Sequence, residues 1–129
     1  MKQLTRKNIM VIGAVIDIAL HATPKRPVSS RAIAARHNLP ARYLEPALQS
    51  LTRVGLLKAT RGPSGGYEIA REGITAEDIL RAAESVEEES VIVSPLLDRI
   101  MPTLARAEES FVSALSQITL KDLTEEVRT

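Results

Sequence analysis

Apolar positions recur with the period of an α-helix at the beginning of the chain. From Thr5 onward, Ile9, Ile12, Ile16 and Leu20 follow helical spacing, and Thr5 offers an N-cap. This pattern predicts a first helix within residues 5–22. Two prolines in the segment TPKRPV, residues 23–28, then end the helical pattern.

A short second helix is predicted at RAIAARH, residues 31–37. Ser29 or Ser30 precedes it as an N-cap, and Ile33 and Ala34 are expected to face inward. Asn38 follows, a residue that tolerates the left-handed backbone of a tight turn. The chain is therefore expected to turn sharply before its next helix.

The third predicted helix lies within LPARYLEPALQSLTRVG, residues 39–55, with Pro40 at its start and Gly55 as its C-terminal stop. With the preceding helix it matches the helix-turn-helix pattern, in which the second helix lies in the DNA major groove. Helical hairpins without any DNA role share this pattern, so it is ambiguous by itself. The predicted apolar face of the third helix consists of Tyr43, Leu44, Ala47, Leu48 and Leu51.

Two short alternating stretches, LLKAT and YEIA, flank the turn-forming RGPSGG at residues 61–66 and predict a β-hairpin. A hairpin placed directly after a helix-turn-helix is typical of the winged variant. Glycines without Cβ atoms let the backbone approach a phosphate or groove wall, and Pro63 restricts the loop. Arg61 would then enter a narrow minor groove, where negative potential is concentrated. The alternative is an ordinary glycine-rich turn with a solvated arginine.

After the hairpin, Thr75 and Asp78 are spaced as a variant capping box, and Ile79, Leu80 and Ala83 are expected in the core. This short helix is expected to close the first domain. An acidic connector follows, VEEESVIV at residues 86–93, and its glutamates suit a solvated loop.

The longest remaining helix is predicted to begin with Ser94 as N-cap and Pro95 as its first residue. Its apolar residues recur every seven positions, and a stripe of this length has little core of its own to cover, which favours pairing with a second copy. The alternative is that it folds back on the first helix of its own chain, and both contacts can exist on different faces. The residues expected in dimerisation are Leu97, Leu104, Phe111, Leu115 and Ile118.

Pro102 is expected to kink this helix or to mark its true start. The segment TLKDL near the end reads as a capped helical turn, and residues 124–129 are expected to be frayed. The predicted fold is mainly α. It comprises a winged helix-turn-helix domain with a two-stranded β-hairpin wing at 1–85, a connector at 86–94, and a long C-terminal dimerisation helix with its tail at 95–129.

Charge is divided unevenly along the chain. Residues 1–71 hold 12 Lys and Arg against 3 Asp and Glu, a net charge of +9, whereas residues 72–129 hold 5 against 13, a net charge of −8. Basic charge gathered in one folded region is expected of a surface that faces a polyanion. The alternative is accidental drift in surface composition.

The sequence resembles the family of winged-helix repressors typified by the iron-sulfur cluster regulator IscR, the nitric-oxide-sensing repressor NsrR and the cysteine-metabolism repressor CymR. The likeness rests on AARHNLPARYLEPALQSLTRVGLLKATRGPSGGYEIAR at 34–71, with LTRK before it and ITAEDILRAAE and ITLKDL after it. It covers nearly the whole chain. It implies a dimeric bacterial transcription factor that binds imperfect promoter palindromes in double-stranded DNA.

The resemblance also implies roles for single residues. Arg42, Tyr43 and Glu45 would reach the DNA from the reading helix, with Arg61 in the minor groove. An arginine pairs with guanine or phosphate, a tyrosine hydroxyl bonds a phosphate, and a glutamate accepts from cytosine. Alternatively, Tyr43 belongs mainly to the core and Glu45 favours the first helical turn. The remaining expected DNA contacts are Thr5, Lys7, Gly62, Gly65 and Gly66.

Three features depart from the family pattern. Sensing members carry three cysteines, whereas this sequence has none, so no family-type cluster, disulfide or other cofactor is expected. Asn8, Ile9 and Met10 replace a common Gly-Arg-Tyr, which removes one expected cation. Pro46 lacks the amide that would bond back to Arg42, so a bend is expected inside the reading helix.

The leading hypothesis is therefore a sequence-specific, homodimeric DNA-binding regulator, a repressor acting in the cytoplasm. No apolar run is long enough for a membrane span, and no membrane partner is expected. The alternative is a winged-helix adaptor without DNA recognition. An enzyme is not expected, because His21 and His37 are isolated and RGPSGG lacks the residues of a phosphate-binding loop. The signal stays open between a small molecule, a partner protein and none, and the acidic connector is where an effector is expected first.

Overall fold

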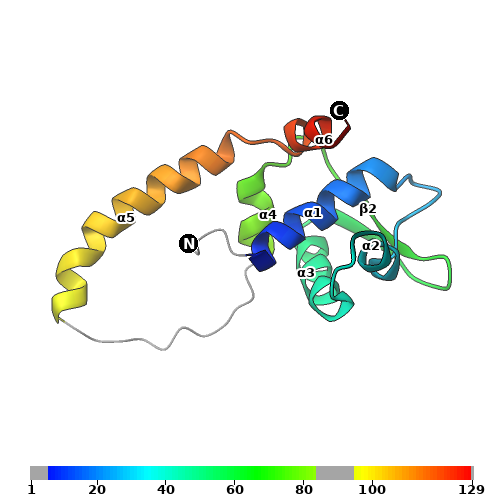
Figure 1. Cartoon of the computed structure of the whole chain (residues 1–129), viewed down its shortest axis with the longest axis horizontal. Helices are drawn as coiled ribbons and strands as arrows, with labels where there is room; N and C mark the ends of the chain where they lie inside the picture. Colours follow the sequence, from blue (N-terminus) through cyan, green and yellow to red (C-terminus); the bar gives the residue numbers. More distant parts are fainter. Residues whose placement is uncertain (1–5, 84–94, 129) are drawn as a thin grey trace.

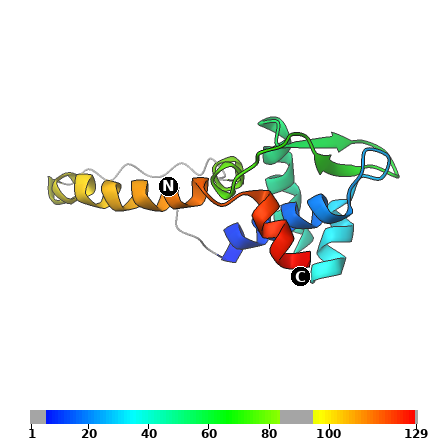
Figure 2. The same cartoon turned by 90° about the horizontal axis from the view of Figure 1, so that it is seen from above.

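The computed structural model describes residues 6–83 and 95–128. Within these residues the chain forms a helical body with a two-stranded hairpin, from which one long helix projects (Figures 1 and 2). The predicted mainly helical, winged-helix architecture is confirmed. The elements in order are α1 (Arg6–His21), α2 (Ser30–His37), α3 (Ala41–Arg53), β1 (Leu57–Thr60), β2 (Gly66–Ile69), α4 (Ala76–Ala83), α5 (Pro95–Ser116) and α6 (Leu120–Arg128).

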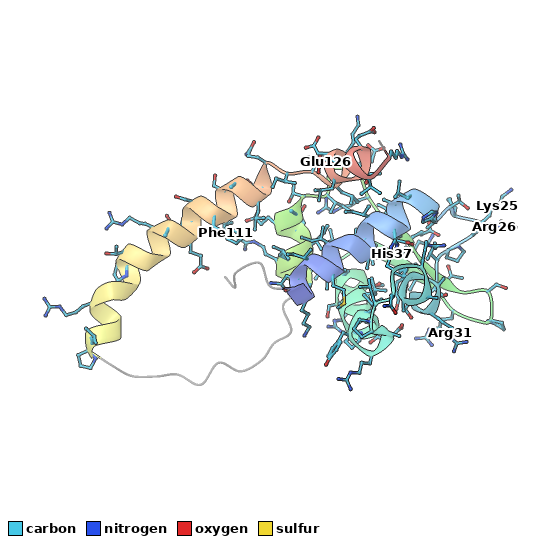
Figure 3. The ribbon with its side chains drawn as sticks, viewed as in Figure 1. Lys25, Arg26, Arg31, His37, Phe111 and Glu126 are labelled. Carbon is cyan, nitrogen blue, oxygen red and sulfur yellow. The ribbon has the colours of Figure 1, made fainter. Side chains whose placement is uncertain are left out.

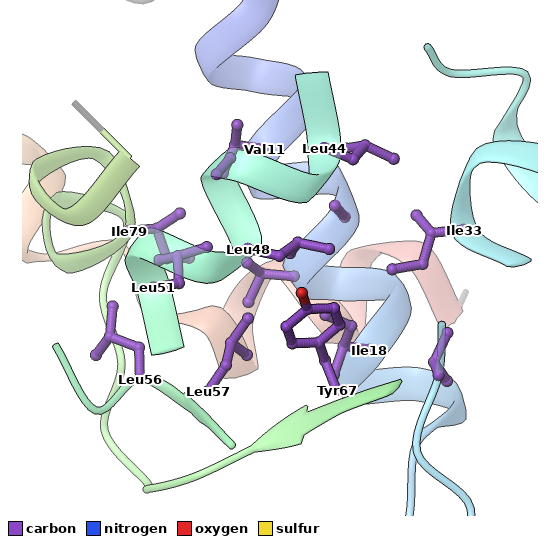
Figure 4. Close-up of a cluster of buried hydrophobic side chains, with 14 of the residues drawn as sticks. Val11, Ile18, Ile33, Leu44, Leu48, Leu51, Leu56, Leu57, Tyr67 and Ile79 are labelled. Carbon is purple, nitrogen blue, oxygen red and sulfur yellow. The ribbon is translucent and has the colours of Figure 1, made fainter. Parts of the chain in front are cut away.

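Helix α1 crosses the centre of the body and turns one apolar face toward the core. The buried residues of that face are Val11, Ala14, Val15 and Ile18, whereas Ile9 is 54% exposed. The spacing that predicted the helix was therefore correct, but it did not mark the core face. Apolar residues lie on most sides of this helix, so tertiary packing selects the face. The core around α1 is completed by residues of the neighbouring elements (Figure 4), among them Ile33, Leu44, Leu48, Leu51, Leu57 and Tyr67.

The turn between α2 and α3 forms as its residue types predict. Ser29 is the N-cap of α2, and its hydroxyl accepts from the Ala32 amide at 3.1 Å. Asn38 adopts the left-handed conformation, with φ of 53°, directly after α2 ends. Pro40 precedes α3, and the helix continues through Pro46 to Arg53, so the distortion expected at that proline does not end it.

The hairpin β1–β2 is antiparallel, with Leu57 opposite Ile69 and Thr60 opposite Gly66. Val28, in the segment before α2, exchanges two backbone hydrogen bonds with Tyr67, at 2.9 and 2.7 Å. These bonds join the wing to the segment that leads into α2. The inner strand position Tyr67 is buried, whereas Lys58, Ala59 and Thr60 of β1 are exposed.

Helices α4 and α6 begin with the same reciprocal cap. The Thr75 amide donates to Asp78 at 2.9 Å and the Asp78 amide donates back to the Thr75 hydroxyl at 3.2 Å. Thr119 and Asp122 repeat this arrangement at α6. Helix α6 continues to Arg128, so the frayed tail expected from residue 124 is wrong. The reason is packing, since α6 contacts α1 and its residues Leu120 and Thr124 are buried.

Helix α5 reaches the body with its C-terminal turns and extends away from it at the other end (Figures 1 and 2). Phe111 and Leu115 pack against Ala76 and Leu80 of α4. Pro102 lies inside the helix, so it does not mark its start. In Figure 1 the yellow first turns curve relative to the rest, as a proline inside a helix favours. Among the described residues, none of the helices is both long enough and apolar enough to cross a bilayer.

Candidate nucleic-acid interface

The N-terminal turn of α3 carries a cationic cluster around one tyrosine. Tyr43 is 40% exposed, which contradicts the alternative that it belongs to the core. An Arg42 Nη donates to the Tyr43 hydroxyl at 2.7 Å, and the guanidinium lies 4.7 Å from the ring centroid. Lys7 of α1 approaches the same ring at 5.9 Å. All three residues are exposed, so a phosphate or a base edge can reach the cations that the ring holds.

Glu45, one turn further along α3, is engaged inside the protein. Its Oε1 accepts from the Tyr67 hydroxyl at 2.8 Å and lies 3.5 Å from the Gln49 side-chain nitrogen. Its Oε2 accepts a short hydrogen bond from the Ser30 hydroxyl. The start of α2, the middle of α3 and the wing strand β2 therefore meet at the Glu45 carboxylate. The sequence predicted Glu45 as a DNA contact and gave no sign of these partners.

The wing tip and α3 border a common groove of about 490 Å³. Arg61 and Gly62 are exposed on the wing side, and Gly62 has a φ of 106° that favours glycine. Glu45 and Gln49 line the α3 side. The groove thus brings the predicted minor-groove residue and the reading helix to one surface, as a winged-helix interface requires.

Gly65 and Gly66 are needed for contacts within the chain. A Cβ on Gly65 would lie 2.1 Å from the Thr60 carbonyl oxygen, and one on Gly66 would lie 2.5 Å from the Val28 carbonyl. No side chain is accommodated at such distances from backbone atoms. The close approach expected of these glycines therefore exists toward the chain itself, and their contact with DNA stays a prediction.

Further cations lie near the wing that were not among the expected contacts. Figure 3 shows Lys25, Arg26 and Arg31 extending outward from the end of the molecule that carries the hairpin. Lys25 and Arg26 belong to a tight turn closed by two hydrogen bonds between the backbones of Thr23 and Arg26, at 3.0 and 3.1 Å. Only the general excess of positive charge in residues 1–71 pointed to this part of the surface.

A second carboxylate, Asp17, gathers one arginine and two histidines around it, and no pattern in the sequence indicated this cluster. The Asp17 side chain is fully buried. Arg36 donates to both of its oxygens, at 2.7 and 3.3 Å, and His37 Nε2 lies 2.5 Å from Oδ2. His21, on the next turn of α1, lies 4.0 Å away. Asp17 appeared in the sequence only as an interruption of an apolar helix, yet both histidines of the chain converge on it.

The surroundings shift the pKa values of three groups. Burial raises the pKa of Asp17, but hydrogen bonds from Arg36 and His37 outweigh it, and the net pKa is below its usual value. The Ser30 hydrogen bond, supported by those from Tyr67 and Gln49, lowers the pKa of Glu45 despite partial burial. Burial, with the neighbouring Glu45, raises the pKa of Tyr67 to about 12. Both carboxylates are therefore ionised and Tyr67 is a neutral donor at pH 7.

The residues predicted for dimerisation are distributed unequally. Leu115 is 4% exposed and packs within its own chain against α4, with Ile12 of α1 and Phe111 at the edge of the same cluster, whereas the alternative to dimerisation had placed the helix on α1. Ile118 lies beyond the end of α5 at Ser116, so the expected heptad repeat does not continue to it. Leu97 and Leu104 lie in α5, but their side chains, like Thr5 and the connector, are outside the described part of the chain.

Comparisons with known proteins relate this chain to transcriptional regulators. The profile of the family Rrf2, described as iron-dependent transcriptional regulators, matches residues 4–126. The chain is 34% identical over 141 residues to slr0846 of Synechocystis, described as an HTH-type transcriptional regulator, with 98% of this chain and 90% of that protein covered. It is 31% identical to the protein rrf2 of Nitratidesulfovibrio vulgaris, covering 94% of this chain and 86% of that one.

Two solved structures extend the likeness to three dimensions. IscR of T. potens superposes with a TM-score of 0.73 at 30% identity, covering 98% of this chain and 88% of that one. CymR of B. subtilis, a global cysteine regulator, superposes with a TM-score of 0.71 at 29% identity, covering 98% of each chain.

The family description names iron, but the side chains that the structure describes form no arrangement that fits an iron site. The 129 residues contain no cysteine. Within the described ranges, no group of three or more His, Cys, Asp or Glu side chains is arranged to hold a metal ion. Asp17 approaches both histidines, but Arg36 already binds both of its oxygens.

Proposed function

This chain belongs to the Rrf2 family of DNA-binding transcriptional regulators, and we propose that it is a homodimeric repressor that binds a promoter palindrome. The observation that carries the proposal is the groove shared by α3 and the wing, with Arg61 on one side and the reading helix on the other. Regulators of this family act by binding DNA and not by catalysis.

In the proposed complex each half-site is contacted by two elements. The N-terminal turn of α3 enters the major groove, where Arg42 binds a guanine or a phosphate and the Tyr43 hydroxyl binds a phosphate. Lys7, beside the Tyr43 ring, contacts the adjoining backbone. The wing places Arg61 in the neighbouring minor groove, where a narrow groove concentrates negative potential.

The proposed dimer is formed through α5. Its first turns project from the body of their own chain (Figure 2), and Leu96 there is 68% exposed. An apolar residue on a projecting helix is buried most simply by a second copy, and a two-fold axis would also pair two reading helices with the halves of a palindrome. Sedimentation of the wild-type protein should give a dimer, and Leu97→Asp with Leu104→Asp should give a monomer. A wild-type monomer at micromolar concentration would contradict this part of the proposal.

The DNA-binding mode is tested with Arg61→Ala. Duplexes selected by the wild-type protein from a random-sequence pool serve as the probe, and Lys121→Ala is the matched control because Lys121 is an exposed cation on α6. We expect Arg61→Ala to weaken binding by about tenfold or more and to reduce the slope of log K against log salt by about 1. The control should bind as wild type. Equal losses in both variants, or no loss in Arg61→Ala, would refute the wing assignment.

A further inference from the structure

One network in the lining of the groove between α3 and the wing connects three elements that a DNA-binding protein of this fold must hold in register. Ser30 begins α2, Glu45 belongs to α3, and Tyr67 belongs to β2. The two hydroxyls donate to opposite oxygens of the Glu45 carboxylate. The Tyr67 ring is buried beneath the wing and only 7% of the residue is exposed. The network therefore fixes the distance between the reading helix and the wing strand.

The same network leaves Glu45 little capacity to read a base. A carboxylate that accepts from cytosine needs an oxygen directed at the major groove. In this protein Oε1 already accepts from Tyr67 and lies near Gln49, and Oε2 accepts from Ser30. Turning the side chain toward DNA would leave the Tyr67 hydroxyl without its acceptor in a buried place, which is costly. A role inside the protein is therefore favoured over direct base contact.

Resting on the proposed function, we propose that Glu45 is a positioning residue, which with Ser30 and Tyr67 sets the wing against the reading helix so that Arg61 enters the minor groove. Tyr67 supports this role at two points, since its backbone also pairs with Val28 while its hydroxyl binds Glu45. The register of the hairpin places Gly66 next to Tyr67 and opposite Thr60, which immediately precedes Arg61. A shift of the Tyr67 ring is thereby transmitted to the wing tip.

A double-mutant cycle separates this role from direct contact. Tyr67→Phe removes only the hydroxyl, and we expect it to weaken binding of the selected duplex by about threefold to tenfold. If the hydroxyl acts by placing Arg61, then Tyr67→Phe should change affinity less than about twofold in the Arg61→Ala background. Unchanged binding by Tyr67→Phe, or losses that multiply in the double variant, would overturn the proposal.

Tyr43→Phe is the matched control for this cycle. It removes the other tyrosine hydroxyl of the chain, which is exposed and binds Arg42 at the N-terminal turn of α3. Because this hydroxyl does not belong to the Glu45 network, its loss should multiply with that of Arg61→Ala. Thermal unfolding of each variant shows whether it is folded at the assay temperature. Should Tyr67→Phe be unfolded there, Ser30→Ala replaces it in the same cycle, with the same expected and contrary results.

Glu45→Gln distinguishes positioning from base readout by a second route. Glutamine keeps an oxygen for the Tyr67 hydroxyl, so a positioning residue should tolerate it, and the duplexes selected should be those of the wild type. A base-reading glutamate replaced by glutamine should instead change the preferred base toward adenine at one position. Such a change would overturn the proposal. Failure of the wild-type protein to select any sequence would count against the proposed function itself, which makes the two failures distinguishable.

Discussion

Two carboxylates, Asp17 and Glu45, each join different elements of the fold, but their partners differ in charge. Asp17 is buried and bound by the Arg36 guanidinium and by His37. Glu45 is half-buried and bound by two neutral hydroxyls, those of Ser30 and Tyr67. The first cluster balances its charge internally, whereas the second leaves a net negative charge at the groove where DNA is expected.

This difference indicates different tasks. A buried, charge-balanced pair fixes the packing of α1 against α2 and resists removal of either partner. A carboxylate held by hydroxyls contributes less to stability than a buried ion pair, because a hydrogen bond to a charged group is worth about 1.5–3 kcal/mol. The negative charge of Glu45 also repels DNA phosphates, so the phosphates are expected to bind at Arg61 and Arg42 and not at Glu45. The Asp17 cluster therefore maintains the fold, and the Glu45 network maintains the geometry of the binding surface.

The largest effect is expected from Asp17→Asn. Removing one partner of a buried ion pair costs about 3–5 kcal/mol when the remaining charge stays buried. Arg36 is 40% exposed at its side chain and can be solvated, so we expect a loss of about 2–3 kcal/mol in the free energy of unfolding. Urea denaturation measures it, with Glu45→Gln as the comparison. A smaller loss for Asp17→Asn than for Glu45→Gln would reverse the division of tasks.

Asp17 should also determine how the free energy of unfolding changes at acid pH. The folded-state pKa of Asp17 is below its usual value of 3.8, so its contribution is present above that value and is lost as pH falls through the folded pKa. The stability difference between wild type and Asp17→Asn should therefore shrink as the pH is lowered from about 5 toward 2. Urea denaturation across this range checks the prediction. A difference that is independent of pH would show that the ionised carboxylate is not what stabilises the protein.

Tyr67→Phe should have a smaller effect on folding, about 1.5 kcal/mol, because it removes one hydrogen bond to a charged acceptor that Ser30 still binds. The alkaline behaviour gives a second readout. The pKa of Tyr67 is raised to about 12, so its contribution is present below its usual value of 10.0 and is lost as pH rises toward 12. Ultraviolet titration of tyrosinate should show a transition of Tyr67 near pH 12 in the wild type that is lost in the variant. A transition near pH 12 that remains in the variant would contradict its assignment to Tyr67.

The smallest effect is expected from His21→Ala. His21 lies 4.0 Å from the buried Asp17 carboxylate and its own side chain is 46% exposed, so we expect a loss below about 1 kcal/mol. Thermal unfolding of His21→Ala beside His37→Ala measures the two histidines against each other. We expect the larger loss for His37, which lies 2.5 Å from the carboxylate. Equal losses would mean that the closer contact of His37 with Asp17 adds no stability.

Local signals in the sequence predicted much of this fold. The cap at Ser29, the left-handed turn at Asn38 and the capping box at Thr75 each depend on residues a few positions apart. The hairpin likewise follows from its turn residues. These features form wherever such residues occur in this order, so a linear pattern is sufficient to predict them.

The remaining features depend on contacts between distant residues. Asp17 meets Arg36 nineteen positions away, and Glu45 meets Tyr67 twenty-two positions away, with no periodicity that links either pair. The core face of α1 could not be selected because apolar residues lie on most of its sides. Gly65 and Gly66 were expected near DNA, yet the backbone that they approach is that of Thr60 and Val28.

The most direct test of the central claim is a titration of isotopically labelled protein with its selected duplex, followed by amide NMR. The account predicts that the largest shifts at low occupancy occur at Lys7, Arg42, Tyr43, Arg61 and Gly62, on α1, α3 and the wing. Amides of α6 around Lys121 should change little. Shifts that concentrate on α6, or that include α3 without the wing, would contradict the convergence of reading helix and wing on one duplex.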